Sequence, residues 1–269
     1  MIDVIKHIAG TYKALRLLLF LVGFSMPLVL MIGGKIKADI PLATHSMSAY
    51  YHLSAAPSVA ANGDYGYTNI PANLGAMRNW FVGALFAVGT LLIAYKGIRP
   101  VEDWVLNFAG IMAWGVAVFP MKWPILSEKA PFSLERVFSS MSLHGTCAAV
   151  LFLCIAYVCI FRAWDTVTEE LMPDPAKRKR YKFGYQVLGW LMGLSPFWAW
   201  AFTMGSPNHL TFWIEAFGVW TFATYWFVKS RELSEINFDE KAMRGEIHVP
   251  KLKSKMDLLR QVPVTKTAP

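Results

Sequence analysis

The sequence predicts an all-α polytopic membrane protein, a single transmembrane helical bundle with six spans. Of its 269 residues, 55% are hydrophobic and only 16% are charged, whereas a soluble domain carries about a quarter charged residues. The apolar residues gather in six runs of about 20 residues, long enough to cross the hydrocarbon core of a bilayer. Because a chain in lipid must satisfy its own backbone hydrogen bonds, each run is expected to be a helix.

The predicted spans divide the chain into one membrane domain and a tail. They cover residues 14–33, 78–96, 104–120, 141–161, 182–204 and 210–228. Residues 1–230 then form the six-span membrane domain, and residues 231–269 form a charged cytoplasmic tail. The first connection, 34–77, is longer than most loops that lack structure of their own. We expect it to fold back as a lid over the outer end of the bundle.

Two glycines on the fifth predicted span indicate close helix packing. Gly189 and Gly193 form a G-x-x-x-G motif, "GWLMG", which lets the backbones of two membrane helices approach closely. We expect both glycines to lie against another helix of the same chain, with a dimer or partner face as the alternative.

The basic residues predict the orientation. With a cytoplasmic N-terminus, 20 of the 26 lysines and arginines fall on the cytoplasmic side, as the positive-inside rule requires. Both termini are therefore predicted to be cytoplasmic. The net charge of +8 follows from this topology, and no nucleic-acid partner is needed to explain it.

Polar residues that are uncommon in membrane segments gather at the predicted outer end. The loop segment 46–52 reads "SMSAYYH", Arg78 and Asn79 begin the second span, and His144 begins the fourth. Glu215 lies near the outer start of the sixth span, in "LTFWIEAFGVWTF". The candidate pocket residues are Ser48, Tyr50, His52, Arg78, Asn79, His144 and Glu215.

Glu215 is the most informative of these residues. A carboxylate in an apolar membrane helix is costly, faces the bundle interior and pairs with another group. The expected partners are Arg78 and His144, in a pair that either fixes helix packing or forms the base of a ligand-binding or proton-handling pocket. The third alternative is a Glu215 that is simply protonated or reaches the membrane interface. The catalytic residues are left unassigned, with His52, His144 and Glu215 as acid–base candidates.

The order of these motifs resembles a family of uncharacterised bacterial six-span integral membrane proteins. The motifs are "SMSAYYH", "MRNWFVGALFAVGTLLIAYKG", "NFAGIMAWGVAVFP", "LH" before Gly145, and "FWIEAFGVWTFATYWFVKS". The "RN.FVG" and "FW.E" pieces are the most specific, and the similarity extends from about residue 46 to 230. It implies the six-span fold, a bacterial cytoplasmic (inner) membrane, and family-type residues at most of the candidate pocket positions, but no activity.

A second, weaker similarity is to the hydrolase superfamily of alkaline ceramidases and adiponectin receptors. It rests on Ser48, on His52 four residues later, and on Asp64. This chain lacks the His-x-x-x-His pair that those proteins carry near the last span, and it has six predicted spans instead of seven. Two of the three expected metal ligands are therefore missing, and we expect no metal and no cofactor.

Three functions remain open from the sequence. The first is an outward-facing polar pocket that binds a small molecule or lipid headgroup. The second is an accessory or structural subunit of a larger membrane complex, and the third is a membrane-embedded lipid hydrolase. The predicted partners are membrane lipids, with other membrane subunits or a second copy of the chain as further candidates.

Overall fold

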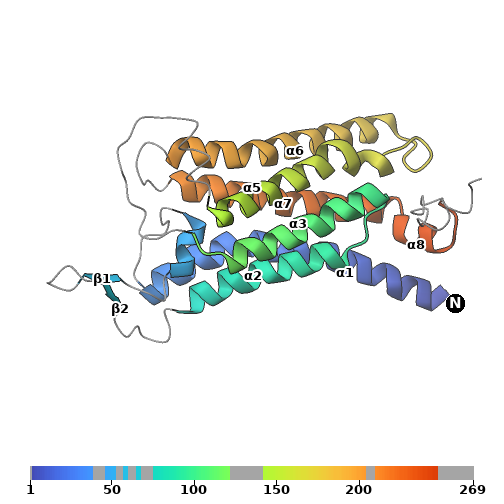
Figure 1. Ribbon diagram of the computed structural model, residues 1–269. Coiled ribbons are helices and arrows are strands. Elements are labelled where there is room, and N and C mark those ends of the chain that lie inside the picture. The colour runs from blue at the N-terminus through green and yellow to red at the C-terminus, as the bar shows by residue number, and fades with distance from the viewer. Residues whose placement is uncertain are drawn as a thin grey trace, which may run out of the picture.

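The computed structural model describes residues 2–38, 46–52, 57–59, 65–67, 75–121, 142–203 and 210–247. Its long helices run alternately in opposite directions and pack side by side (Figure 1). They are α1 (Ile2–Ala38), α2 (Gly75–Ala94), α3 (Pro100–Val118), α5 (Leu143–Tyr157), α6 (Pro175–Thr203) and α7 (Leu210–Glu235). The predicted bundle of long helices is confirmed.

Within the described residues, four segments are long and apolar enough to cross a membrane. They are Val4–Ile36, Gly75–Ala94, Pro100–Val118 and Leu143–Thr166. The last one joins α5 to a π-helical turn, η2 (Val158–Arg162), and a 3₁₀ turn, η3 (Ala163–Thr166). Apolar side chains such as Leu18, Leu21 and Phe24 on α1 are exposed, as expected for helices that face lipid.

The helix ends differ from the ends of the predicted spans, as at α3 and α5, because local capping contributes to where a helix begins. Pro100 stands at the first position of α3, where its missing N–H costs nothing. The Ser142 hydroxyl accepts a hydrogen bond from Gly145 N–H at the start of α5. The Asp174 carboxylate does the same for Ala176 N–H at the start of α6, which satisfies donors that the helix leaves unpaired.

The bundle has two distinct ends (Figure 1). We call the first the N-terminal end, where the start of α1 and the short helix α8 (Phe238–Met243) lie. We call the other the loop end, where the 3₁₀ helix η1 (Met47–His52) meets the bundle. A small antiparallel pair, β1 (Pro57–Val59) and β2 (Tyr65–Tyr67), belongs to the same loop, with Ser58 paired to Gly66.

Small residues set the distances between neighbouring helices. A Cβ atom added to Gly189 would come within 2.4 Å of the Ile160 side chain, and one added to Gly193 within 3.2 Å of the Ala156 Cβ. Both glycines thus lie against α5 and η2, which confirms that they pack within the chain. Gly89 of α2 and Gly110 of α3 meet in the same way, each backbone against the other.

Candidate functional site at the loop end

The carboxylate of Glu215 is held by the segment that begins η1. Its two oxygens lie 2.9 and 2.8 Å from Ser46 Oγ, and Oε2 accepts a hydrogen bond from Met47 N–H at 2.6 Å. Glu215 stands in the second turn of α7, while Ser46 and Met47 come from the first loop. The bonds therefore fasten this loop to the last long helix.

The rest of η1 packs down on the helix ends. Met47, Ser48 and Tyr50 of η1 are buried, as is Ser46 just before it, and η1 contacts α1, α2 and α7. The Tyr50 ring lies against Phe212, with 6.2 Å between centroids. The described part of the loop is thus seated across the bundle and does not extend away from it.

Serine hydroxyls form a short chain at this point. Ser48 Oγ lies 2.7 Å from Ser46 Oγ and donates to Met121 Sδ at 3.2 Å. Ser48 therefore reaches Glu215 through one intervening hydroxyl. The lid hypothesis requires a loop side chain of this kind beside the carboxylate.

Arg78 contacts η1 through the aromatic ring of Tyr51. Its guanidinium carbon lies 5.0 Å from the centroid of the Tyr51 ring, a cation–π distance, and the side chain remains exposed. Asn79 and Trp80 follow it on α2 and are exposed as well. Because Met47 binds Glu215 and Tyr51 underlies Arg78, η1 bridges the acidic and the basic residue across roughly 8 Å of 3₁₀ rise.

His144 belongs to a different contact at the same end. Its Nδ1 lies 2.7 Å from the carbonyl oxygen of Phe119, just past the end of α3, and the residue is buried. This bond ties the start of α5 to the end of α3. It gives His144 the packing role that was one of its two interpretations, but with a backbone carbonyl as the partner and not Glu215.

The contacts differ from the expected pairing of Glu215 with Arg78 or His144. The hydrogen bonds that hold the carboxylate come from a hydroxyl and a backbone amide, and Ser46, which supplies the hydroxyl, was missed as a site residue. The side chains of His52, Asp64 and His209 lie outside the described residues. Among the described residues, no three His, Cys, Asp or Glu side chains are grouped so as to hold a metal ion.

A second polar cluster, not anticipated from the sequence, lies at the N-terminal end. We call it the lysine network: Thr166, Tyr185, Lys229 and Glu232, all fully buried. Lys229 Nζ donates to Glu232 Oε2 at 2.9 Å, to Thr166 Oγ1 at 2.7 Å and to the Ala163 carbonyl at 2.7 Å. Glu232 also accepts hydrogen bonds from Tyr185, at 2.5 Å, and from Thr166.

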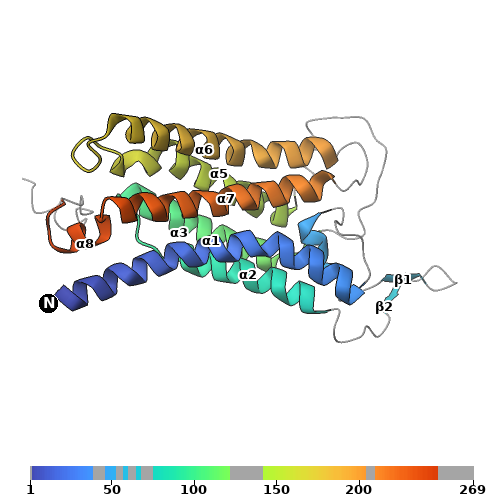
Figure 2. The ribbon, with the colours of Figure 1, turned by 180° about the vertical axis from the view of Figure 1, so that it is seen from behind.

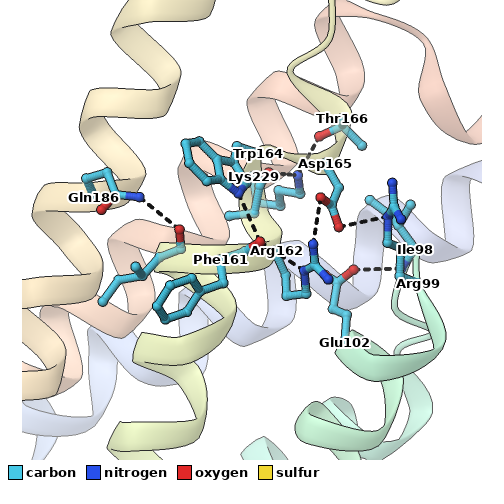
Figure 3. A network of polar contacts seen from close by, with 12 residues as sticks. Ile98, Arg99, Glu102, Phe161, Arg162, Trp164, Asp165, Thr166, Gln186 and Lys229 are labelled. Carbon is cyan, nitrogen blue, oxygen red and sulfur yellow. Dashed lines mark hydrogen bonds and ion pairs between the residues drawn. The ribbon is translucent and has the colours of Figure 1, made fainter.

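Ion pairs surround this network and close the N-terminal end. Figure 3 shows Asp165 between Arg99 and Arg162, at 3.0 and 3.1 Å respectively, with Lys229 and Thr166 close by. Arg16 of α1 forms a two-pronged pair with Asp239 of α8. Part of the segment assigned to the tail thus packs on the bundle. The only sequence signal of the network is the spacing of Lys229 and Glu232, three residues apart on one helix.

Comparisons of the chain with protein-family models, with curated protein sequences and with solved structures gave no match. The resemblance to bacterial six-span membrane proteins therefore stays a prediction. A function for the chain is therefore argued from the side-chain contacts at the two ends of the bundle.

Proposed function

We propose that the chain is a six-span protein of the bacterial cytoplasmic membrane with both termini in the cytoplasm. The four apolar helices of crossing length support this, and so does the antiparallel packing of α6 and α7 alongside them (Figures 1 and 2). The N-terminal end is then cytoplasmic and the loop end is exported, which agrees with the bias of basic residues.

Cysteine labelling of intact cells tests this orientation. A membrane-impermeant thiol reagent is expected to reach a cysteine placed at Asp64 or Lys129, in the two predicted exported connections, and not one placed at Arg178. The three native cysteines lie within α5 and η2 and are wholly or partly buried, so they give little background. Labelling of the cysteine at position 178 alone would show that the orientation is the reverse of the one proposed.

We propose that the loop end binds a lipid headgroup or a similar small anionic molecule. The observation that carries this is the bridge of η1, which Glu215 fastens to α7 while Tyr51 underlies the exposed guanidinium of Arg78. A guanidinium supported on an aromatic ring presents its donors in the plane that a phosphate group needs. Glu215 acts as a positioning residue, since it holds the lid and so places Tyr51.

The neighbouring residues fit the same membrane boundary. Trp80 is exposed beside Arg78, and Trp213 is exposed beside Phe212 at the start of α7. Tryptophan collects at the level of lipid headgroups because its ring is apolar and its N–H is polar. Arg78 thus stands at the depth where a phosphate of the outer leaflet is available.

A structural subunit is the second candidate, because the polar residues of this end also satisfy one another. Glu215 is bonded to Ser46 and Met47, and His144 to the Phe119 carbonyl. Contacts of this kind organise a bundle without any ligand. For the hydrolase alternative, Ser48 bonds to Ser46 and Met121, and no described contact supports an activated nucleophile.

Thermal unfolding with a thiol-reactive dye separates the two candidates. The buried Cys147 and Cys159 become reactive only on unfolding, and a ligand of the folded state raises the transition temperature. We expect soluble dihexanoyl-phosphatidylglycerol to stabilise the wild-type protein. Arg78→Gln is expected to bind it about tenfold more weakly, because a hydrogen bond to a charged group contributes about 1.5–3 kcal/mol.

Matched variants give the controls. Lys35→Gln removes a positive charge from the loop end of α1, near the end of the bundle where Arg78 lies on α2, and should leave lipid binding intact. Glu215→Gln keeps an acceptor for Met47 N–H and a partner for Ser46, so the lid stays fastened, whereas Glu215→Ala releases it and is expected to abolish the lipid effect. If dihexanoyl-phosphatidylglycerol stabilises neither the wild-type protein nor any variant, the structural candidate is correct.

A further inference from the structure

A groove runs between α1 and α7 on the surface near the N-terminal end. It has a volume of about 280 Å³ and is lined by Lys13, Leu17, Phe20, Phe227, Ser230, Arg231 and Ser234. The two helices are neighbours in the bundle and face the viewer together in Figure 2. All seven residues lie far from the loop-end site and from the ligand proposed there.

The lining has a clear polarity along the helix axes. On α1, which runs away from the N-terminal end, Lys13 comes first and Leu17 and Phe20 follow toward the middle. On α7, which runs the other way, Phe227 lies nearest the middle, and Ser230, Arg231 and Ser234 follow toward the N-terminal end. The polar residues thus gather at the end of the groove and the apolar ones gather deeper, which is the polarity of a phospholipid in a leaflet.

The charges at the polar end are available to a ligand. Lys13 is exposed and has no ion-pair partner among the described residues. In the described part of the chain Arg231 forms an ion pair with Glu235 alone, at 3.4 Å, and both side chains are solvent-accessible, so this pair contributes little. The seven residues that line the groove include two basic and no acidic side chains, so the formal charge of the lining is positive.

We propose that this groove binds an anionic phospholipid of the leaflet at the N-terminal end. Lys13 and Arg231 pair with its phosphate, the hydroxyls of Ser230 and Ser234 stand beside the glycerol oxygens, and an acyl chain lies on Leu17, Phe20 and Phe227. Basic pockets between membrane helices on the cytoplasmic side bind acidic lipids in this way. The proposal rests on the membrane insertion of α1 and α7, and not on any ligand at the loop end.

The size of the groove fits partial enclosure of such a lipid. Pockets that enclose a whole small molecule measure about 300–1,000 Å³, and this groove is slightly smaller. It therefore accommodates the phosphate and the start of one chain. The remainder of the lipid lies among its neighbours in the bilayer, against exposed side chains such as Leu21 and Phe24.

Native mass spectrometry of the full-length protein, released from detergent, tests the proposal. Increasing amounts of palmitoyl-oleoyl-phosphatidylglycerol are added. The control lipid is palmitoyl-oleoyl-phosphatidylcholine, which has the same acyl chains but no net charge. We expect phosphatidylglycerol to bind saturably and phosphatidylcholine to bind at least tenfold more weakly. The Lys13→Gln/Arg231→Gln double variant is expected to bind phosphatidylglycerol about thirtyfold more weakly, since each basic residue contributes about 1 kcal/mol.

The control is Lys179→Gln/Arg180→Gln on α6. It removes one lysine and one arginine from exposed positions at the same end of the bundle, and we expect it to bind phosphatidylglycerol like the wild type. Phe227→Ser, which keeps the charges of the groove, should weaken the binding of both lipids. Equal binding of the two lipids, an equal loss in the control, or displacement by inorganic phosphate alone overturns the proposal. A loop-end Arg78→Gln variant that keeps this binding shows that the two sites are independent.

Discussion

Replacing Glu232 by leucine is expected to destabilise the folded protein strongly. The substitution leaves the Lys229 ammonium buried without its carboxylate and deprives Thr166 and Tyr185 of a shared acceptor. Breaking a buried ion pair by removing one partner costs about 3–5 kcal/mol. A loss of this size lowers the midpoint of thermal unfolding by roughly 10 °C, which fluorescence-detected size exclusion after heating measures.

The double variant Lys229→Met/Glu232→Leu is the matched control. It removes both buried charges together, and such replacements by apolar residues are often neutral or stabilising. We expect it to recover a large part of the lost midpoint, although Tyr185 and Thr166 remain without their acceptor. A single Glu232→Leu variant as stable as the wild type would show that the lysine network does not hold α7 against α6 and η3.

The helices were predictable because their signal is local. Long apolar runs identify the bundle, and the G-x-x-x-G spacing of Gly189 and Gly193 correctly placed them against another helix. The helix ends were less accurate, since capping by Pro100, Ser142 and Asp174 decides them, and not hydropathy. The expectation that Glu215 faces the bundle interior and has a polar partner also relied on local information, the cost of a carboxylate in an apolar helix.

The partners of the buried groups were not predictable. Electrostatic reasoning paired Glu215 with Arg78 or His144, but the register in which a loop crosses helix ends brought Ser46 and Met47 to the carboxylate instead. The lysine network joins η3, α6 and α7, segments that are far apart in sequence. Its geometry also depends on the π-helical turn at 158–162, which changes the register of the residues after it and has no reliable signature.

Replacing Gly89 by alanine is expected to separate α2 from α3. A Cβ atom at this position would lie 2.7 Å from the Gly110 carbonyl oxygen and 2.4 Å from a Trp114 ring carbon. The carbonyl belongs to the backbone and cannot turn away, so the helices must move apart and lose the close contact that small residues permit. Overpacking of this kind costs about 1–3 kcal/mol. The reciprocal Gly110→Ala variant meets the Gly89 carbonyl at 2.6 Å and should behave alike.

Gly83→Ala on the same helix is the comparison that isolates this contact. A Cβ atom there meets nothing within 4 Å, and alanine favours the helix over glycine by about 1 kcal/mol. We therefore expect Gly83→Ala to match or exceed the wild type in midpoint and yield, while Gly89→Ala and Gly110→Ala fall below it by several degrees. Equal stability of the α2 variants Gly83→Ala and Gly89→Ala would mean that α2 and α3 do not meet backbone to backbone. The packing of the spans would then depend on larger side chains such as Trp114.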